Sequence, residues 1–448
     1  MIELTLNQVA TALHAQFSGA DAPFTGISTD TRQLTPGMLY VALRGQRFDG
    51  HQFLAQAQQQ GAIAAIVEQP VTLPNFPTLQ VENTLHALGE LAKLWRQRFS
   101  IPLIALTGSN GKTTTKEMIH TIFAQQGLGL ATQGNLNNEI GVPLTLFRLG
   151  AEHRHAVIEM GANHAGEIQN LTQMAQPTVA VITQCAPSHL EGFKSLDGVA
   201  HAKGEIFSGL RADGVAVINV DDNYNNLWQT LASPHRILSF GFTQSASVTA
   251  TNIHLTASGS EFTLKTEKGD IQIQLPLLGK HNIMNALAAS AAALACELPL
   301  TIVQAGLQII QSVKGRLQPK TARNHNLLLD DTYNANPTSL HAALDVLMHY
   351  PAPRWLILGD MNELGQESAA LHQQSGTLAR KLGVEQLWTV GTMSKHAASS
   401  FGTHATHFDD HASLIAALQN ELARQQGITL LIKGSRGMTM EQVVQALQ

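Results

Sequence analysis

The sequence predicts an α/β protein of three domains: a small α/β N-terminal domain, a central domain with a parallel sheet and a β insertion, and a C-terminal Rossmann-like doubly wound domain. Three observations lead to this fold class. The chain has 448 residues, which corresponds to roughly three domains of about 150 residues each. Short, continuously apolar runs alternate with longer helix-compatible segments, as in sheets covered by helices on both faces. Turn-rich segments separate three regions, which we place at residues 1–82, 83–313 and 314–448.

The first region combines short strand-like runs with turn signals. The two clearest runs lie at residues 38–43 and 62–67. The region ends in a loop-like segment that contains Pro70, Pro74 and Pro77, and prolines interrupt both helices and sheets. This pattern predicts a small α/β domain.

The second region is typical of a parallel sheet with helices on both faces. A helical stretch over residues 84–98 precedes a buried-strand pattern over residues 101–106. Further short apolar runs occupy residues 156–158, 179–182 and 215–218. Strands that are apolar throughout are buried on both faces, which favours a parallel sheet.

Residues 248–278 break this rhythm, because polar and apolar residues alternate and a turn signal stands at Lys268-Gly269-Asp270. Alternation with a period of two predicts an antiparallel β insertion. An alanine-rich helix over residues 282–294 closes the central domain. The third region then repeats the α/β pattern, with strands expected at residues 327–329, 355–358, 387–390 and 429–432.

Composition excludes several classes of protein. Lys and Arg total 28 against 33 Asp and Glu, a net charge of −5, which argues against a polybasic nucleic-acid binder. No apolar run reaches the roughly 18–20 residues of a membrane helix, and residues 1–5 do not resemble the start of a signal peptide. Two cysteines, Cys185 and Cys296, cannot form a disulfide framework and are expected to be buried thiols. We therefore expect a soluble, cytoplasmic protein without membrane insertion and without a nucleic-acid partner.

The segment TGSNGKTTT at residues 107–115 carries the strongest functional signal. A buried strand precedes it, and a helix expected over residues 112–126 follows it. Glycines let backbone N–H groups turn toward phosphate oxygens, and the helix N-terminus adds positive potential. Lys112 would reach the β- and γ-phosphates, and the Thr113 hydroxyl would bind Mg²⁺. The predicted nucleotide-binding residues are Thr107, Gly108, Ser109, Asn110, Gly111, Lys112, Thr113 and Thr114.

This loop departs from the usual phosphate-binding pattern, because Leu106 stands where a glycine is expected. An ordinary strand-to-helix turn is the competing interpretation. A second metal ligand is expected at the end of a neighbouring strand, and Glu159 after residues 156–158 is our choice. Asp221 is its main rival. On spacing alone, His189 is a surface or core histidine and Lys203 a solvated helix lysine.

Together these segments resemble the Mur ligase family of ATP-dependent amide-forming enzymes, and in particular its branch that adds D-Ala-D-Ala. The resemblance covers essentially the whole chain, and the short phosphate loop is the form found in that family. The other matching segments are residues 28–32, 36–37, 48–51, 134–141, 279–286, 314–316, 330–337, 359–365 and 433–436.

The resemblance implies roles for residues that their spacing leaves open. It implies that Lys112, Glu159, His189 and Lys203 are catalytic, and that two Mg²⁺ ions bind Thr113, Glu159, His189 and a carbamoylated Lys203. ATP would also contact Asn282, Asn285, Arg316, Asp331 and Asn334. The substrate would contact Ser28, Asp30, Arg32, Asn135, Asn137 and Asn138.

The implied reaction joins UDP-MurNAc-tripeptide to D-Ala-D-Ala through an acyl phosphate and releases ADP and phosphate. The implied enzyme is a monomer whose C-terminal domain closes about a hinge near residues 313–315. Two alternatives stay open: another amide ligase of the same family, such as a tripeptide-forming Mur ligase or a folylpolyglutamate synthase, or a P-loop NTPase switch. The sequence does not distinguish lysine from diaminopimelate at the third peptide position.

Overall fold

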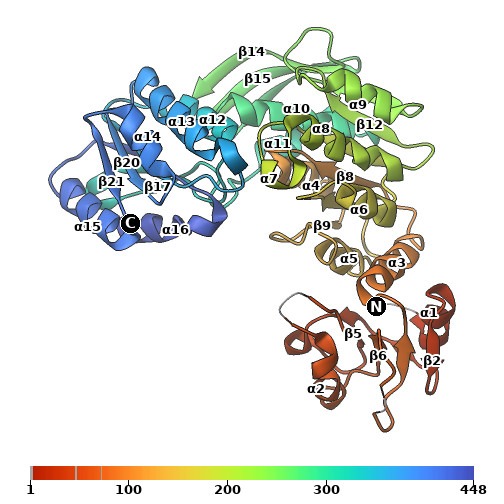
Figure 1. Ribbon diagram of the computed structural model, residues 1–448. Coiled ribbons are helices and arrows are strands. Elements are labelled where there is room, and N and C mark those ends of the chain that lie inside the picture. Colours follow the sequence, from red (N-terminus) through yellow and green to blue (C-terminus); the bar gives the residue numbers. More distant parts are fainter. Residues whose placement is uncertain (1–3, 46–47, 72) are drawn as a thin grey trace.

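The computed structural model describes residues 4–45, 48–71 and 73–448, arranged as three sheet-based parts in chain order (Figure 1). The first three residues of the predicted N-terminal domain, with residues 46, 47 and 72, lie outside the described residues. The N-terminal part and the C-terminal part lie on different sides of the central part (Figure 1). The predicted α/β architecture with parallel sheets is confirmed.

The N-terminal part contains a five-stranded sheet in the order β2-β7-β6-β5-β4, parallel except for β2. Its strands are β2 (Gln16–Ser18), β4 (Ile27–Ser28), β5 (Leu39–Val41), β6 (Ala64–Val67) and β7 (Thr78–Gln80). A small antiparallel pair and two helices complete it: β1 (Leu4–Thr5), β3 (Pro23–Phe24), α1 (Leu6–Ala12) and α2 (Leu54–Gln59). The strands expected at residues 38–43 and 62–67 correspond to β5 and β6.

The central part is built on a nine-stranded sheet in the order β16-β15-β14-β13-β12-β11-β8-β10-β9. The strands from β9 to β13 pair in parallel. They are β8 (Leu103–Thr107), β9 (Gly129–Ala131), β10 (His155–Glu159), β11 (Val179–Ile182), β12 (Val215–Asn219) and β13 (Arg236–Phe240). This is the predicted parallel sheet, and the buried strand expected over residues 101–106 is β8.

Helices cover both faces of this sheet, as the sequence predicts. On one face lie α3 (Thr84–Arg96), α5 (Gly141–Leu146), α6 (Glu167–Ala175) and α9 (Asn225–Ala232). On the other lie α4 (Lys112–Ala124), α10 (Lys280–Ala295) and α11 (Leu300–Gln308). In β8, Leu103 and Ala105 join the first apolar cluster, whereas Ile104 and Leu106 join the second. A strand buried on both faces must be apolar at every position, which explains its continuous run.

The predicted β insertion is an antiparallel ribbon that extends the central sheet. It consists of β14 (Val248–Thr256), β15 (Gly259–Thr266) and β16 (Gly269–Leu275). Within the described residues, the ribbon joins the parallel strands through the pairing of Phe240 with Val248. The alternating pattern therefore identified the ribbon correctly, whereas its attachment to the sheet edge is a tertiary feature.

The C-terminal part contains a six-stranded sheet in the order β17-β18-β22-β19-β20-β21, parallel except for β17. Its strands are β17 (Gln318–Thr321), β18 (Leu327–Asp331), β19 (Arg354–Gly359), β20 (Gln386–Val390), β21 (Ala405–Phe408) and β22 (Thr429–Lys433). Its helices are α12 (Pro337–Leu347), α13 (Ser368–Leu382), α14 (Ser394–Phe401), α15 (His411–Leu422) and α16 (Glu441–Leu447). The sequence pattern missed β17 and β21, because these edge strands are short and carry few apolar residues.

The apolar clusters are distributed differently among the three parts. One cluster runs from the N-terminal part into the central part and includes both Leu4 and Trp228. The C-terminal part has two clusters of its own, in which Leu278 is the contribution from the central part. In the described chain, no helix has the length and apolar character that a membrane span requires.

A histidine pair is buried where β10 begins. His155 is 1% exposed, its Nε2 lies 3.3 Å from Nδ1 of His120, and its ring packs against Phe123. Burial, together with the neighbouring His120 and His153, lowers the pKa of His155 to about 4. The ring is therefore neutral in the folded protein under conditions in which an unfolded histidine takes up a proton.

Replacement of His155 with glutamine should make stability less sensitive to acid. Between pH 6.5 and about 4 the unfolded chain binds the proton at this position and the native protein does not. The free energy of unfolding therefore falls as the pH drops through this window, by roughly 3 kcal/mol for this group. Denaturant unfolding across the window should give a shallower pH slope for His155→Gln. The exposed control His254→Gln should keep the wild-type slope, and equal slopes in all three proteins would contradict the prediction.

Candidate active site

The predicted phosphate loop lies between β8 and α4 and is held by neighbouring backbone. Gly108 and Gly111 have φ angles of +151° and +83°, which favour glycine. The Ser109 hydroxyl donates to the carbonyl of Ala186 and accepts from its N–H, each at 2.9 Å. Lys112 donates from Nζ to the carbonyl of Gly108 at 2.7 Å. Thr113 and Thr114 are buried in the first turn of α4, and Thr107 is the buried end of β8.

The N-terminus of α10 packs directly behind this loop. Asn285 donates to Oδ1 of Asn282 at 3.0 Å, and Asn282 donates to the carbonyl of Leu278 at 2.8 Å. This chain holds Oδ1 of Asn285 so close to Gly111 that a Cβ atom there would lie 2.3 Å from it. Asn285 is thus adjacent to the phosphate loop and Asn282 holds it in place, whereas the contact of either residue with a nucleotide stays a prediction.

Glu159 lies beside the loop because β10 pairs in parallel with β8, with Glu159 opposite Leu106. Its carboxylate is 2% exposed. Oε1 accepts a hydrogen bond from Nδ2 of Asn137 at 2.9 Å, whereas Oε2 has no partner among the described residues. A buried anionic oxygen without a partner is costly, and a bound cation would relieve that cost. Glu159 therefore suits Mg²⁺, which prefers oxygen ligands.

The rival carboxylate, Asp221, is engaged elsewhere. It accepts hydrogen bonds from the backbone N–H groups of Phe242 and Thr243, at 2.5 and 3.2 Å. Within the described parts of the chain, no three His, Cys, Asp or Glu side chains gather closely enough to hold a metal.

Lys203 is a buried lysine, not the solvated one that its spacing alone suggests. It lies on α8 (Leu196–Gly204) and is 5% exposed. No hydrogen bond or ion pair from a described residue holds its ammonium group. Burial, reinforced by the charge of Lys112, lowers the pKa of Lys203 to about 7. A substantial fraction of Lys203 is therefore a neutral, nucleophilic amine at neutral pH.

His189 lies at the boundary with the C-terminal part. It precedes α7 (Leu190–Phe193), and its Nδ1 lies 2.5 Å from Oε2 of Glu363. The backbone N–H of Leu190 donates to the carbonyl of Glu363 at 3.1 Å. The adjacent His189 ring holds the pKa of Glu363 below its ordinary value. Sequence reasoning included Glu363 in a matching segment but gave it no role.

One basic residue of the C-terminal part, Arg316, interacts electrostatically with the nucleotide loop. Arg316 lies over the ring of Tyr333 at 4.2 Å, and its buried Nε has no partner among the described residues. Burial lowers the pKa of Lys112, with Glu159 opposing the shift and Arg316 adding to it. Arg316 thus acts electrostatically on the phosphate loop from another part of the chain.

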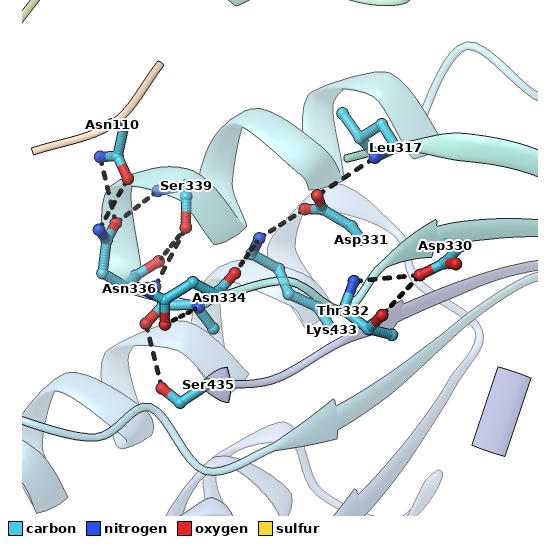
Figure 2. Close-up of polar contacts among 11 residues, drawn as sticks. Asn110, Leu317, Asp330, Asp331, Thr332, Asn334, Asn336, Ser339, Lys433 and Ser435 are labelled. Atoms are coloured by element: carbon cyan, nitrogen blue, oxygen red, sulfur yellow. Dashed lines mark hydrogen bonds and ion pairs between the residues drawn. The ribbon is translucent and has the colours of Figure 1, made fainter. Parts of the chain in front are cut away.

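Figure 2 shows a polar network in the C-terminal part. Lys433 forms an ion pair with Asp331 at 2.5 Å and donates to the carbonyl of Asn334 at 3.0 Å. The other oxygen of Asp331 accepts from the N–H of Leu317 at 3.2 Å. The two predicted nucleotide contacts, Asp331 and Asn334, are therefore brought together by Lys433, whose role the sequence did not reveal.

Asn110 connects the phosphate loop to the C-terminal part (Figure 2). Its Oδ1 accepts from Nδ2 of Asn336 at 2.8 Å, and its Nδ2 lies 3.4 Å from Oδ1 of Asn336. Asn336 is also the N-cap of α12, where its side chain accepts from the N–H of Ser339. Asn336 lies in one of the matching segments, but the sequence assigned it no role. An asparagine directly before a proline is typical of a helix N-cap, and this was the signal that the sequence offered.

The predicted substrate-binding residues fall into two groups. The Ser28 hydroxyl donates to the carbonyl of Asp30, whose carboxylate pairs with Arg32 at 2.7 Å, and the Arg32 side chain is 85% exposed. Ser28 ends β4 of the N-terminal part, and Asp30 and Arg32 follow this strand. Asn135 is exposed in the loop before α5, and Asn138 accepts from the N–H of Gly141 at 2.9 Å. Of this second group, Asn137 is the residue that donates to Glu159.

The fold and the site define an ATP-using enzyme, in which an unpartnered carboxylate lies beside a phosphate loop and Arg316 of a second α/β part acts on that loop. Comparison with protein-family models identifies the same class of enzyme. The Mur ligase family catalytic domain matches residues 23–96, the Mur ligase middle domain residues 106–293, and the Mur ligase glutamate ligase domain residues 315–436. The chain belongs to the Mur ligase family, whose members are ATP-dependent amide ligases.

Individual relatives match along their whole length. The UDP-N-acetylmuramoyl-tripeptide–D-alanyl-D-alanine ligase of Escherichia coli (strain K12) is 47% identical over 449 residues, covering 100% of this chain and 99% of the relative. The ligase of the same name from Haemophilus influenzae is 45% identical, with the same coverage. A crystal structure of MurF from Acinetobacter baumannii has a TM-score of 0.94 at 36% identity, and covers 100% of this chain and 99% of that one.

Replacement of Gly111 with alanine should weaken nucleotide binding. A φ angle of +83° is unfavourable for alanine, by about 1–2 kcal/mol, and the new methyl group would also collide with Asn285. We expect affinity for a fluorescent ATP analogue to fall by roughly tenfold or more, measured by equilibrium titration.

Gly166→Ala is the matched control. Gly166 also precedes a helix, α6, with a φ angle of +88°, but no atom lies within 4 Å of the Cβ position. This variant should carry the backbone strain without changing nucleotide affinity. Equal affinity in Gly111→Ala and Gly166→Ala would contradict the role assigned to the Asn285 contact.

Proposed function

We propose that this enzyme uses ATP to join the carboxylate of UDP-MurNAc-tripeptide to the amine of D-Ala-D-Ala. The products are UDP-MurNAc-pentapeptide, ADP and phosphate, the last cytoplasmic peptide-adding step in making the peptidoglycan precursor. The observation that carries this proposal is the 47% identity, along the full chain, to the Escherichia coli ligase of that name. Other amide ligases of the family are the remaining alternative.

The chemistry requires charge neutralisation and positioning more than a protein nucleophile. Forming an amide from a carboxylate is uphill, and ATP converts that carboxylate into an acyl phosphate with a good leaving group. The amine then attacks the acyl carbon. Lys112 and Arg316 would face the transferring phosphoryl group, and the backbone N–H groups of the loop would hold the other phosphates. Asn282, Asn285, Asp331 and Asn334 would orient the rest of the nucleotide.

Two Mg²⁺ ions complete the proposed site. Thr113 and Glu159 would hold one, and His189 with a carbamoylated Lys203 would hold the second. When bound, the ions neutralise negative charge on the phosphates and on the substrate carboxylate. The unpartnered Oε2 of Glu159 supports the first site.

We also propose carbamoylation of Lys203, and the environment of this residue supports it. The neutral amine adds to the carbon of CO₂, an N–C bond forms and a proton is released, which leaves an anionic carbamate. The lowered pKa of Lys203, about 7, supplies the neutral amine, and its burial near Lys112 favours replacement of a cation by an anion. A carbamate also offers the oxygen ligand that Mg²⁺ prefers.

We propose that residues 1–82 bind the UDP end of the substrate through Ser28, Asp30 and Arg32. Residues 83–313 bind ATP, and the loop carrying Asn135, Asn137 and Asn138 faces the peptide. Residues 314–448 close over the site with the dipeptide, about a hinge near residues 313–315. The φ angle of +70° at Gly315 and its carbonyl's hydrogen bond from the N–H of Tyr333 support a turn there. Closure would keep water from the acyl phosphate. We also propose a cytoplasmic monomer.

Phosphate release tests the reaction. With Mg²⁺-ATP we expect release only when both the UDP-linked tripeptide and D-Ala-D-Ala are present, together with a mass gain of one dipeptide in the product. Release in the absence of both substrates would contradict the proposal and indicate an NTPase switch. Release with another amino acid or with folate, and none with this pair, would indicate a different branch of the family.

Lys203→Ala should lose most activity, and short carboxylic acids should restore part of it by supplying the missing anionic oxygen. Wild-type activity should also rise with bicarbonate. The exposed control Lys268→Ala should behave as wild type under all conditions. Full activity of Lys203→Ala without added acid would rule out the carbamate.

A further inference from the structure

Asn137 connects the loop before α5 to the buried carboxylate of Glu159. Its Nδ2 donates a hydrogen bond to Oε1 of Glu159 at 2.9 Å. An ionised carboxylate only accepts hydrogen bonds, so Asn137 must present its amide nitrogen to this partner. Oε2 of Glu159 is buried and has no partner among the described residues. The two oxygens of this carboxylate therefore differ, because Asn137 pairs with one and the other stays unpaired.

The backbone around Asn137 is fixed by the strand that carries Glu159. The N–H of Gly161, two residues after Glu159, donates to the carbonyl of Asn137 at 2.9 Å. The N–H of Asn137 donates in turn to the carbonyl of Asn135 at 2.8 Å. A Cβ atom at Gly161 would lie 3.1 Å from the Asn137 side chain, so the two segments are in close contact. Asn137 is thus held at a defined place beside the carboxylate.

The main chain of Glu159 is held from another side. Its N–H donates to the hydroxyl of Thr132 at 3.0 Å, and Thr132 is 2% exposed. Nζ of Lys116 donates to the carbonyl of Thr132 at 2.7 Å, which fixes Thr132 in turn. With its main chain held at Thr132 and one carboxylate oxygen held by Asn137, the Glu159 side chain keeps little freedom to rotate.

We propose that Asn137 is a positioning residue that acts through Glu159: it fixes the carboxylate by its hydrogen bond to Oε1 and so reserves Oε2 for the cation. Residues that hydrogen-bond a metal ligand set its orientation and tune metal affinity. This role differs from the substrate contact that the sequence leads us to expect, because the amide nitrogen of Asn137 is already engaged by Glu159. The inference rests on the Mg²⁺ site proposed above for Glu159.

The binding test compares wild type, Asn137→Ala and Gln133→Ala as full-length proteins, with a fluorescent ATP analogue as the probe. In EDTA, without metal, we expect equal affinities in the three proteins. When Mg²⁺ is added, Asn137→Ala should need roughly 10–100-fold more Mg²⁺ than wild type for the half-maximal gain in affinity. Gln133→Ala should match wild type, because it removes an exposed carboxamide from the same loop.

Two results of this titration would overturn the proposal. One is an equal Mg²⁺ requirement in Asn137→Ala and wild type. The other is an equal loss of affinity in EDTA and in Mg²⁺, which would mean that Asn137 only maintains the shape of the loop.

A double-mutant cycle with Glu159→Gln tests whether Asn137 acts through the carboxylate. Glu159→Gln should itself raise the Mg²⁺ requirement, because a neutral amide is a poorer ligand for Mg²⁺ than a carboxylate. Adding Asn137→Ala to Glu159→Gln should then change the requirement little further, since the two residues share one function. Effects that simply add would show independent roles and contradict the proposal.

The same titrations separate this inference from the proposed function. An unchanged Mg²⁺ requirement in Glu159→Gln would refute the metal site itself. A changed requirement in Glu159→Gln without one in Asn137→Ala would refute only the role of Asn137. Neither measurement uses the UDP-linked tripeptide or D-Ala-D-Ala, so failure of the ligase reaction would appear separately, as absent product in wild type.

Discussion

The parallel pairing of β8 with β10 is the contact on which the rest of the site depends. It places Glu159 opposite Leu106, which is the second-last residue of β8. The phosphate loop follows directly after this strand. Because the carboxyl ends of parallel strands share one edge of a sheet, the loop after β8 and the carboxylate ending β10 meet without further adjustment. The apolar residues of both strands, buried on two faces, hold this register.

Around that edge the protein leaves charged groups incompletely paired. Glu159 has an unpartnered oxygen, Arg316 an unpartnered nitrogen, and Lys203 no hydrogen-bonding partner among the described residues. Buried polar groups without partners reduce stability. The nucleotide, metal ions and carbamate proposed above would pair with these groups. Ligand binding would therefore offset the electrostatic cost of leaving them unpaired.

The three parts are joined by different kinds of contact, and this bears on motion. An apolar cluster continues from the N-terminal part into the central part, whereas the C-terminal part has its own cores. Its recorded links to the catalytic edge are mainly polar: Asn110 with Asn336, and His189 with Glu363. Polar contacts can form and break at less cost than an apolar core, which is compatible with the closure proposed above for the C-terminal part. The contact of Asn110 with Asn336 would couple that closure to the phosphate loop.

The sequence by itself determined the features that depend on neighbours along the chain. The glycines and Lys112 of the phosphate loop, the apolar strands and the alternating ribbon each have local patterns, and the order of the matching segments identified the family. Only the tertiary structure decided which distant residues meet. Asn110 and Asn336 are 226 positions apart, and Asp331 and Lys433 are 102 apart. Such pairs, like the edge strands β17 and β21, follow from how the sheets assemble. Local propensity does not encode that assembly residue by residue, because each contact exists only after the whole topology has formed.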